Sequence, residues 1–154
     1  MKLSTRGRYI TRALLDLACH CQGGMVPLKD IARRQEISLY YLEHLITPLI
    51  AAGIVRSLRG PSGGVQLAKP PHEIRLNEVI RLVEGSLVTV ECVGHPGICP
   101  RSQLCITREI WVELERAMSE VLESTTLQDL VERQKQKEQA NARPRKIRQV
   151  KGGG

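Results

Sequence analysis

The first 69 residues carry three short helical patterns followed by a hairpin pattern. Apolar residues recur at helical spacing in each of the three segments, and capping or terminating residues stand at their ends. The expected helices begin after Ser4 or Thr5, cover about 28–35, and cover about 39–52 behind the capping residue Ser38. Two strand-like segments, 54–58 and 65–69, then flank a glycine-rich loop. This order of helices and hairpin predicts a winged helix-turn-helix.

The second half of the chain carries a long amphipathic pattern. A short amphipathic helix is predicted at 76–84, a cysteine-bearing loop at about 91–105, a long helix from about Ile106, and a last helix at about 126–139 that fades into the tail. An apolar stripe follows the long helix through Ile106, Ile110, Leu114, Ala117, Met118, Val121 and Leu122. The stripe packs either within the chain or against a second copy. We favour a homodimer, because winged helices usually read two half-sites.

Charge is divided unevenly along the chain. The net charge is +7, from 23 Lys and Arg against 16 Asp and Glu. Residues 1–69 carry a net charge of +6, residues 70–132 a net charge of −6, and residues 133–154 a net charge of +7. A basic winged helix favours a polyanion such as double-stranded DNA as its partner. A solvated basic surface without a partner is the alternative for the same composition.

These patterns together predict a fold that is mainly α with a small β-hairpin wing: a winged helix-turn-helix plus a long dimerisation helix. The chain divides into three parts. They are a DNA-binding domain at 1–70, a cysteine loop with dimerisation helices at 71–132, and a basic disordered tail at 133–154.

Several classes of protein are excluded by what the sequence lacks. No apolar run approaches the roughly 18 residues of a membrane helix, and Arg12 and Asp16 interrupt any signal-peptide pattern, so we expect a cytoplasmic protein. The absence of Phe disfavours stacking of single-stranded bases on aromatic platforms. No P-loop, Rossmann spacing or nucleophile–base pair occurs. We therefore expect neither an enzyme nor a small-molecule substrate.

Base reading is expected at the start of the third helix. In a helix-turn-helix, the N-terminal residues of the second helix of the pair reach the bases in the major groove. The candidates are Ser38, Tyr40, Tyr41, Glu43 and His44. A carboxylate such as Glu43 is costly among phosphates unless it accepts a hydrogen bond from cytosine N4. An ion pair with Arg33 or Arg34 is the alternative for Glu43, and His44 contacts either a phosphate or nothing.

Further contacts are expected from the wing and the first helix. Arg59 stands at the root of the wing, and Gly60 lets the backbone approach closely, so Arg59 can enter a minor groove. A hairpin loop with a solvated arginine is the alternative. Lys2 and Arg6 can contact backbone phosphates, and each such contact should weaken with salt.

Three of the five cysteines lie within one loop of 14 residues. Without a secretory signal, Cys92, Cys99 and Cys105 favour metal ligation or a redox switch over a disulfide framework. Thiolates are natural ligands of iron–sulfur units. Three thiols are one short of four ligands, and His95 in the same loop is the candidate fourth. A carboxylate or a group from a partner chain is a further possibility.

Four motifs distinguish the chain as a whole: MKLSTRGRY at the start, then ISLYYLEHL, then RGPSGGVQLAK, then three cysteines followed by ITREIW. From Met1 to about Leu130 the chain resembles the IscR-like family of bacterial winged-helix iron–sulfur transcription regulators, with NsrR, RirA and CymR as relatives. The resemblance implies a homodimeric DNA-binding regulator. It implies an iron–sulfur cluster on the three loop cysteines, with 2Fe-2S favoured and 4Fe-4S the alternative. It also implies base reading by Glu43 and minor-groove insertion by Arg59.

The chain departs from this family at the fourth ligand. Arg108 stands where IscR has a His, and Arg8 stands where NsrR-like proteins have an Asp that acts on the partner's cluster. Tyr40 replaces a smaller residue of IscR.

The resulting hypothesis is a regulator that senses iron–sulfur, iron, redox or nitrosative status through a labile cluster. The alternative is a cluster-free winged-helix regulator controlled by a thiol switch or a protein partner, as CymR-like relatives imply. A zinc-stabilised binding module and a thiol oxidoreductase are further rivals, and the absence of a C-x-x-C motif disfavours the oxidoreductase.

Overall fold

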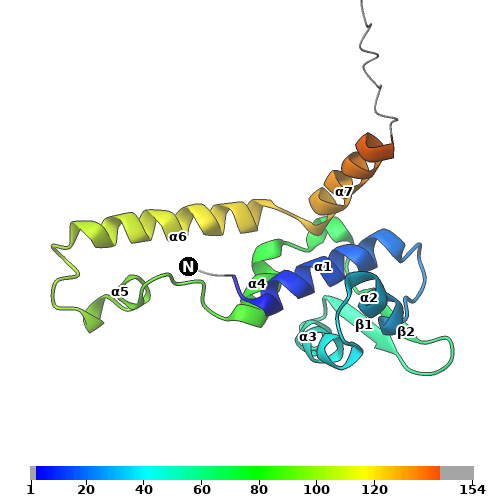
Figure 1. Ribbon diagram of the computed structural model, residues 1–154. Helices are drawn as coiled ribbons and strands as arrows, with labels where there is room; N and C mark the ends of the chain where they lie inside the picture. Colours follow the sequence, from blue (N-terminus) through cyan, green and yellow to red (C-terminus); the bar gives the residue numbers. More distant parts are fainter. Residues whose placement is uncertain (1–2, 143–154) are drawn as a thin grey trace, which may run out of the picture.

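The computed structural model describes residues 3–142 as a mainly helical protein with one two-stranded antiparallel sheet (Figure 1). The elements are α1 (Thr5–His20), α2 (Leu28–Gln35), α3 (Leu39–Ala51), β1 (Val55–Leu58), β2 (Gly64–Leu67), η1 (Pro71–Glu73), α4 (Leu76–Glu84), α5 (Glu91–Gly94), η2 (Pro96–Ile98), α6 (Ile106–Ser124) and α7 (Leu127–Ala142). The predicted winged helix-turn-helix followed by a long helix is confirmed. Within residues 3–142, every helix is too short or too polar to cross a membrane.

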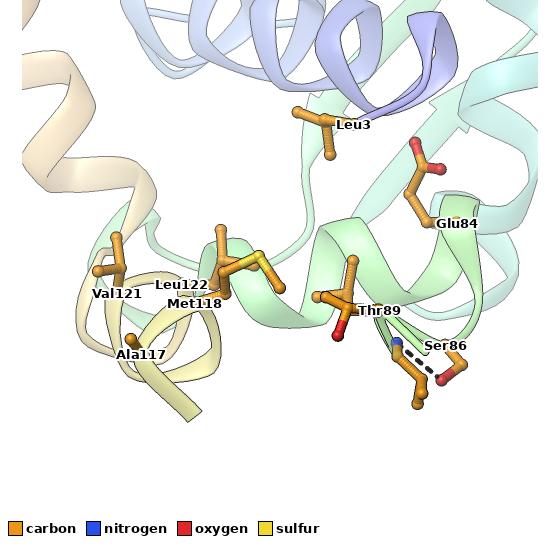
Figure 2. Close-up of a pocket in the computed structure, with 10 residues that line it drawn as sticks. Leu3, Glu84, Ser86, Thr89, Ala117, Met118, Val121 and Leu122 are labelled. Atoms are coloured by element: carbon orange, nitrogen blue, oxygen red, sulfur yellow. Dashed lines mark hydrogen bonds between the residues drawn. The ribbon is translucent and has the colours of Figure 1, made fainter. Parts of the chain in front are cut away.

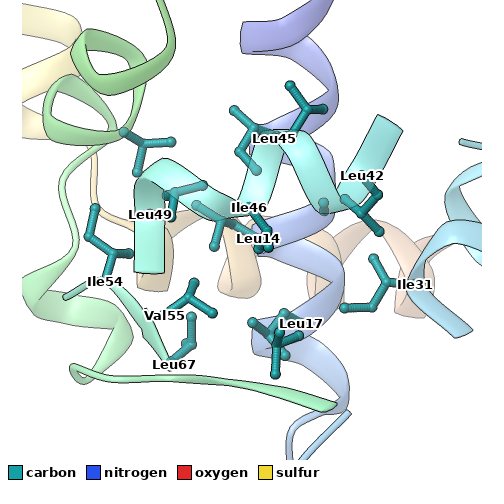
Figure 3. Close-up of a cluster of buried hydrophobic side chains, with 14 of the residues drawn as sticks. Leu14, Leu17, Ile31, Leu42, Leu45, Ile46, Leu49, Ile54, Val55 and Leu67 are labelled. Carbon is teal, nitrogen blue, oxygen red and sulfur yellow. The ribbon is translucent and has the colours of Figure 1, made fainter. Parts of the chain in front are cut away.

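The winged-helix module is built around an aliphatic core (Figure 3). Leu14 and Leu17 of α1 and Ile31 of α2 are at most 1% exposed. Four residues of α3 meet them at helical spacing: Leu42, Leu45, Ile46 and Leu49. Burial of each such side chain contributes about 1.5–3 kcal/mol. One face of α3 is therefore held in the core, and the opposite face remains open.

The hairpin is attached to the helices through its second strand. Val55 of β1 lies opposite Leu67 of β2. Val65 of β2 also exchanges backbone hydrogen bonds of 2.8 Å with Val26, just before α2. Gly64 lies so close to this segment that a Cβ would collide with the carbonyl group of Val26. The close approach of the strand fixes the wing beside α1 and α3.

A clasp joins the start of α4 to the junction of α6 and α7. Arg75 Nη1 donates a hydrogen bond of 2.6 Å to the Glu123 carbonyl oxygen, and Asn77 donates one of 2.7 Å to the Glu123 carboxylate. The Leu127 N–H donates to the Ile74 carbonyl oxygen over 2.8 Å. Because α4 also packs against α1 and α3, the end of α6 is fixed to the DNA-binding module.

Most of α6 lies outside this packing. Figure 1 shows it running away from the module, with α5 beside its start. None of its 19 residues is buried. Ile106, Ile110 and Val121 are 70%, 54% and 62% exposed. The apolar stripe found in the sequence is therefore exposed at these three residues, whereas Leu114, Met118 and Leu122 are half-buried.

The C-terminal helix reaches further than expected. The sequence predicts a last helix at about 126–139 that fades into a basic tail placed at 133–154, and α7 continues as far as Ala142. Strong helix formers fill this stretch, and Gln134 donates a hydrogen bond of 2.7 Å to Glu138 one turn later. Residues 143–154, the rest of the predicted tail, lie outside the described residues, as does Lys2.

Candidate DNA-reading surface and cysteine loop

The start of α3 presents an exposed face opposite its buried one. Ser38 is the N-cap, and its Oγ accepts the Tyr41 N–H over 3.2 Å. Tyr40 is 71% exposed, and Glu43 and His44 are exposed as well. Residues three and four apart share one face of a helix. The structure therefore brings Tyr40, Glu43 and His44 together on the open side of α3.

Tyr41 faces another way. It is half-buried and packs on the core. Its ring meets the Tyr9 ring edge to face, with the centroids 6.1 Å apart, and the Arg12 guanidinium lies 5.7 Å from the centroid of Tyr9. Tyr41 thus joins α3 to α1. The DNA contact predicted for Tyr41 finds less support in this position than the contacts predicted for its neighbours.

Glu43 has no cationic partner within residues 3–142. Arg33 lies 3.9 Å from Asp30, and Arg34 is held by Asp16. The structure does not contain the alternative considered for Glu43, an ion pair with either arginine. Its carboxylate remains free to accept hydrogen bonds from another molecule.

A buried carboxylate fixes α2 against α1. The Asp16 side chain is 2% exposed, and Arg34 Nε donates to its two oxygens over 3.0 and 2.9 Å. Gln35 Nε2 donates to the same carboxylate over 2.9 Å. Burial raises the pKa of Asp16, but these hydrogen bonds and the charge of Arg34 outweigh it, so the pKa lies below its usual value. The network fixes the position of the helix that precedes α3.

Arg59 extends from the wing into solvent. It directly follows β1 and, within residues 3–142, its side chain has neither a hydrogen bond nor an ion pair. Gly60 adopts a φ of 111°, a conformation that strains other residues. A side chain at Gly63 would collide with the Leu58 carbonyl oxygen. The glycines therefore shape the turn that presents Arg59.

The basic residues at the start of α1 differ in how they are bound. Arg6 is exposed and, within the described residues, has no partner. Arg8 donates a hydrogen bond of 3.4 Å to Thr5. Arg12 donates to the side chain and the carbonyl group of Gln35 over 3.1 and 2.9 Å. Of these side chains, Arg6 is the freest to contact a phosphate.

A groove lies between the end of α4, the segment 86–89 and α6 (Figure 2). Its volume is about 680 Å³. Leu3 and Glu84 lie on one side and Met118 on the other. Glu84 also accepts hydrogen bonds from the Gly7 N–H, over 3.0 Å, and from the Ser4 hydroxyl. A carboxylate at a helix N-terminus is favourable, so Glu84 links the end of α4 to α1, a role that sequence reasoning missed.

The cysteine loop is folded, and its three thiols stand on different parts of it. Cys92, Cys99 and Cys105 are free, half-buried thiols, and His95 is exposed between α5 and η2. Within residues 3–142, no three side chains of His, Cys, Asp or Glu come together in a way that could hold a metal ion. Arg108 Nε donates a hydrogen bond of 2.9 Å to the Cys92 carbonyl oxygen, which ties α5 to the start of α6.

The donor groups of the loop fit an iron–sulfur cluster in their chemistry. Three thiols on one loop are the ligand type that such clusters use. Ser102 is 7% exposed, and its hydroxyl has no hydrogen-bond partner among the described residues. A buried hydroxyl without a partner costs free energy, so a bound group that accepts its hydrogen bond would be stabilised there. Arg108 itself cannot ligate a metal.

Cys105 stands at the N-cap of α6. Its Sγ lies 3.2 Å from the Thr107 hydroxyl. The hydrogen bond with Thr107, followed by the Arg108 backbone N–H, lowers the pKa of the Cys105 thiol. A lower pKa raises the share of thiolate, the form that binds metals and reacts with oxidants. The position of Cys105 directly before the predicted helix was the signal in the sequence for this environment.

The fold and the open face of α3 define a winged-helix DNA-binding protein. Residues 3–133 match the family model Rrf2, described as an iron-dependent transcriptional regulator. The chain belongs to the Rrf2 family.

Similar proteins agree with this assignment. The chain is 44% identical over 131 residues to the HTH-type transcriptional regulator IscR of Aliivibrio salmonicida, which covers 85% of this chain and 77% of that protein. It is 46% identical over 131 residues to protein rrf2 of Nitratidesulfovibrio vulgaris, with coverage of 85% and 87%. The structure of CymR, the global cysteine regulator of B. subtilis, has a TM-score of 0.73 at 38% identity and covers 86% of this chain and 97% of its own.

The structure of T. potens IscR also has a TM-score of 0.73 at 38% identity, with coverage of 89% and 90%. The IscR relative is a transcriptional regulator and not an enzyme. The predicted resemblance to IscR and the predicted non-enzymatic class are confirmed, and the chain is a DNA-binding transcription regulator.

Proposed function

We propose that this regulator is a homodimer that senses iron–sulfur, iron or redox status through its cysteine loop, 91–105. One observation carries the proposal: the three loop thiols lie at the start of a long helix whose other end is fixed to the DNA-binding module. A change in the loop can thereby reach the reading surface.

The dimer is supported by the uncovered face of α6. Ile106 and Ile110 are exposed near its start, and Val121 is exposed near its end, beside the groove. A helix of 19 residues is about 28 Å long. Two antiparallel α6 helices would place the start of each against the groove of the other, which closes a two-fold dimer.

The hydrogen bonds of the clasp connect the cysteine loop, through α6, to the DNA-binding module. Arg108 ties α5 to the start of α6, and Glu123 ties the end of α6 to Arg75 and Asn77. Helix α4, which begins directly after Arg75, packs on α3 and α1. A shift of α6 in the dimer would therefore change the spacing of the two α3 helices, and so the affinity for paired half-sites.

Cys92, Cys99 and Cys105 would hold the cluster, and His95 is the candidate fourth ligand on this chain. When bound, an iron–sulfur cluster supplies a group that changes oxidation state and is lost when iron is scarce. The Ser102 hydroxyl, buried in the same loop, can donate a hydrogen bond to a sulfur atom. A bound cluster would hold the three thiolates in one arrangement, and the hydrogen bond from Arg108 to the Cys92 carbonyl oxygen would connect that arrangement to α6.

Anaerobic isolation tests the cluster. We expect a coloured protein whose iron and acid-labile sulfide match a cluster, and Mössbauer spectroscopy would distinguish 2Fe-2S from 4Fe-4S. Replacement of the three loop cysteines by Ser should remove the colour, whereas Cys19→Ser on α1 is the matched control and should keep it. A colourless wild-type protein without iron after reconstitution would refute the cluster.

A thiol switch without a cluster is the second candidate, and the environment of Cys105 favours it. Thr107 lowers the pKa of this accessible thiol. The structure of the oxidised form of Staphylococcus aureus CymR, at 39% identity, is one of those that resemble this chain. Hydrogen peroxide can convert two thiols to a disulfide and two water molecules. Thiol titration before and after peroxide, on protein shown to contain no iron, would detect the loss of two thiols.

A further inference from the structure

We infer that Tyr40 and His44 form one base-reading unit on α3, in which His44 Nε2 accepts a hydrogen bond from an exocyclic amino group in the DNA major groove. The inference rests on DNA reading by α3, which is part of the proposed site, and it deepens that site by naming the chemistry of its target.

The side chains of Tyr40 and His44 are in contact across one turn of α3. Their ring centroids lie 4.4 Å from each other, with an angle of 47° between the planes. Tyr40 is 71% exposed, and His44 is exposed beside it. Long exposed side chains usually sample several rotamers. The ring contact restricts this freedom, so the imidazole is oriented before DNA arrives.

The backbone of Tyr40 fixes which nitrogen of His44 carries the proton. His44 Nδ1 lies 3.0 Å from the Tyr40 carbonyl oxygen. A carbonyl oxygen can only accept, so Nδ1 is the donor of this hydrogen bond. In the neutral ring Nε2 is then left as an acceptor. Nε2 is the ring nitrogen without a partner among the described residues.

DNA offers few groups that an acceptor can bind. Phosphate oxygens, guanine N7 and O6, and thymine O4 are themselves acceptors. The donors in the major groove are the amino groups at adenine N6 and cytosine N4. Glu43, adjacent to His44, is also an acceptor and has no ion pair among the described residues. The open face of α3 therefore presents two neighbouring acceptors, which suit amino groups better than the phosphate backbone.

The test uses the full-length protein and a duplex selected from a randomised pool. Each adenine of the selected site is replaced in turn by purine, which lacks the N6 amino group, and each cytosine by 2-pyrimidinone, which lacks the N4 amino group. We expect wild-type affinity to fall about tenfold at the position that His44 reads. His44→Ala should bind the unmodified site about tenfold more weakly and should be insensitive to the replacement at that position. The position found separates adenine from cytosine as the target.

Two variants of Tyr40 separate the ring contact from the hydroxyl group. Tyr40→Phe keeps the ring and should keep the sensitivity to the amino group, whereas Tyr40→Ser removes the ring and should reduce it. Both changes lie on the exposed face, and circular dichroism would show that the variants are folded.

Three results would overturn the inference. The first is that His44→Ala remains as sensitive as wild type at every position. The second is that His44→Ala weakens selected and random duplexes equally and flattens the salt dependence, which would indicate a phosphate contact. The third is that wild type binds no duplex above background, and this result alone would also refute DNA reading by α3.

Discussion

The winged-helix module and α6 satisfy their apolar residues in different ways. In the module, the helices and the hairpin bury a shared core in which Leu42, Leu49 and Ile54 have no exposed surface. In α6 no residue is buried, although an apolar stripe runs along it. The module therefore holds its shape through contacts within the chain, whereas the position of α6 depends on what covers it. The proposed regulation uses this contrast, because it needs a DNA-binding module of fixed shape and a helix whose exposed face can meet a partner.

The largest effect is expected from the core of the module. Leu42→Ala removes a side chain with no exposed surface, and it should lower the free energy of unfolding by about 2–5 kcal/mol. Urea denaturation followed by circular dichroism would measure it. A loss below about 1 kcal/mol would mean that the module is less tightly packed than described.

The buried ion pair between α1 and α2 should come next. Asp16→Asn leaves Arg34 without its anion and should cost about 2–4 kcal/mol at neutral pH. Because folding lowers the pKa of Asp16, the stability it contributes is present above the usual carboxyl pKa of about 3.9 and is lost as the pH falls through the folded value. Urea denaturation from pH 7 to pH 3 should thus show a smaller acid loss in Asp16→Asn.

Asp30→Asn is the matched control for that change. Asp30 is 36% exposed and lies 3.9 Å from Arg33, an arrangement that contributes less than about 0.5 kcal/mol. Equal losses for Asp16→Asn and Asp30→Asn would contradict the role given to the buried network.

Replacing an apolar residue of α6 by Ala should weaken association of the dimer instead of destabilising the fold. Ile110→Ala, at a residue 54% exposed, should change the unfolding of the monomer little and weaken the dimer by about 1–2 kcal/mol. Analytical ultracentrifugation over a concentration series would measure the dimer. Glu113→Ala on the polar side of α6 is the control. If Ile110→Ala and Glu113→Ala dimerised alike, the stripe would not be the interface.

Substitutions on the DNA-reading surface should change binding specificity more than they change the stability of the fold. Glu43→Ala should reduce discrimination between selected and random duplexes, and Arg59→Ala should cost about 1–3 kcal/mol in binding to the selected site. Fluorescence anisotropy with both duplexes would distinguish these outcomes. Unchanged discrimination in both variants would remove Glu43 and Arg59 from the base-reading set.

The smallest effect is expected at Arg6. Arg6→Ala should weaken all duplexes alike and lower the slope of log affinity against log salt by about one unit. Anisotropy titrations at several salt concentrations would check it. A change confined to one sequence would contradict a phosphate contact.

The sequence predicted the local elements and the open face of α3 because both depend on near neighbours. Apolar spacing located α1 to α4 and α6 to within a few residues, and Ser4 and Ser38 cap their helices as expected. The last helix was expected at about 126–139, and only its last turn, as far as Ala142, was missed, because the basic, proline-containing composition favoured a tail there. Periodicity reports such local preferences well.

The contacts that link distant segments could not be predicted from the spacing of apolar residues. Gly7 and Glu84 are 77 residues apart, and Cys92 and Arg108 are 16 apart, so no helical or strand period connects them. The partners of Arg33 and Arg34 also depended on tertiary packing, which assigned them to Asp30 and Asp16 and left Glu43 free. The segment 91–105 was expected as a loop, whereas Cys92 lies in the short helix α5 and η2 follows it. Spacing alone does not determine the geometry of its cysteines and of His95.

The central claim is that the state of the cysteine loop controls DNA affinity through α6. The most direct test is the affinity for a selected duplex, measured anaerobically on protein reconstituted with iron and sulfide and again after chelation, in wild type and in the variant with Ser at positions 92, 99 and 105. We expect wild-type affinity to change by about tenfold or more, equivalent to about 1.4 kcal/mol of coupling, and the variant to show no change. Equal wild-type affinities before and after chelation, with cluster loss verified by absorption, would contradict the claim.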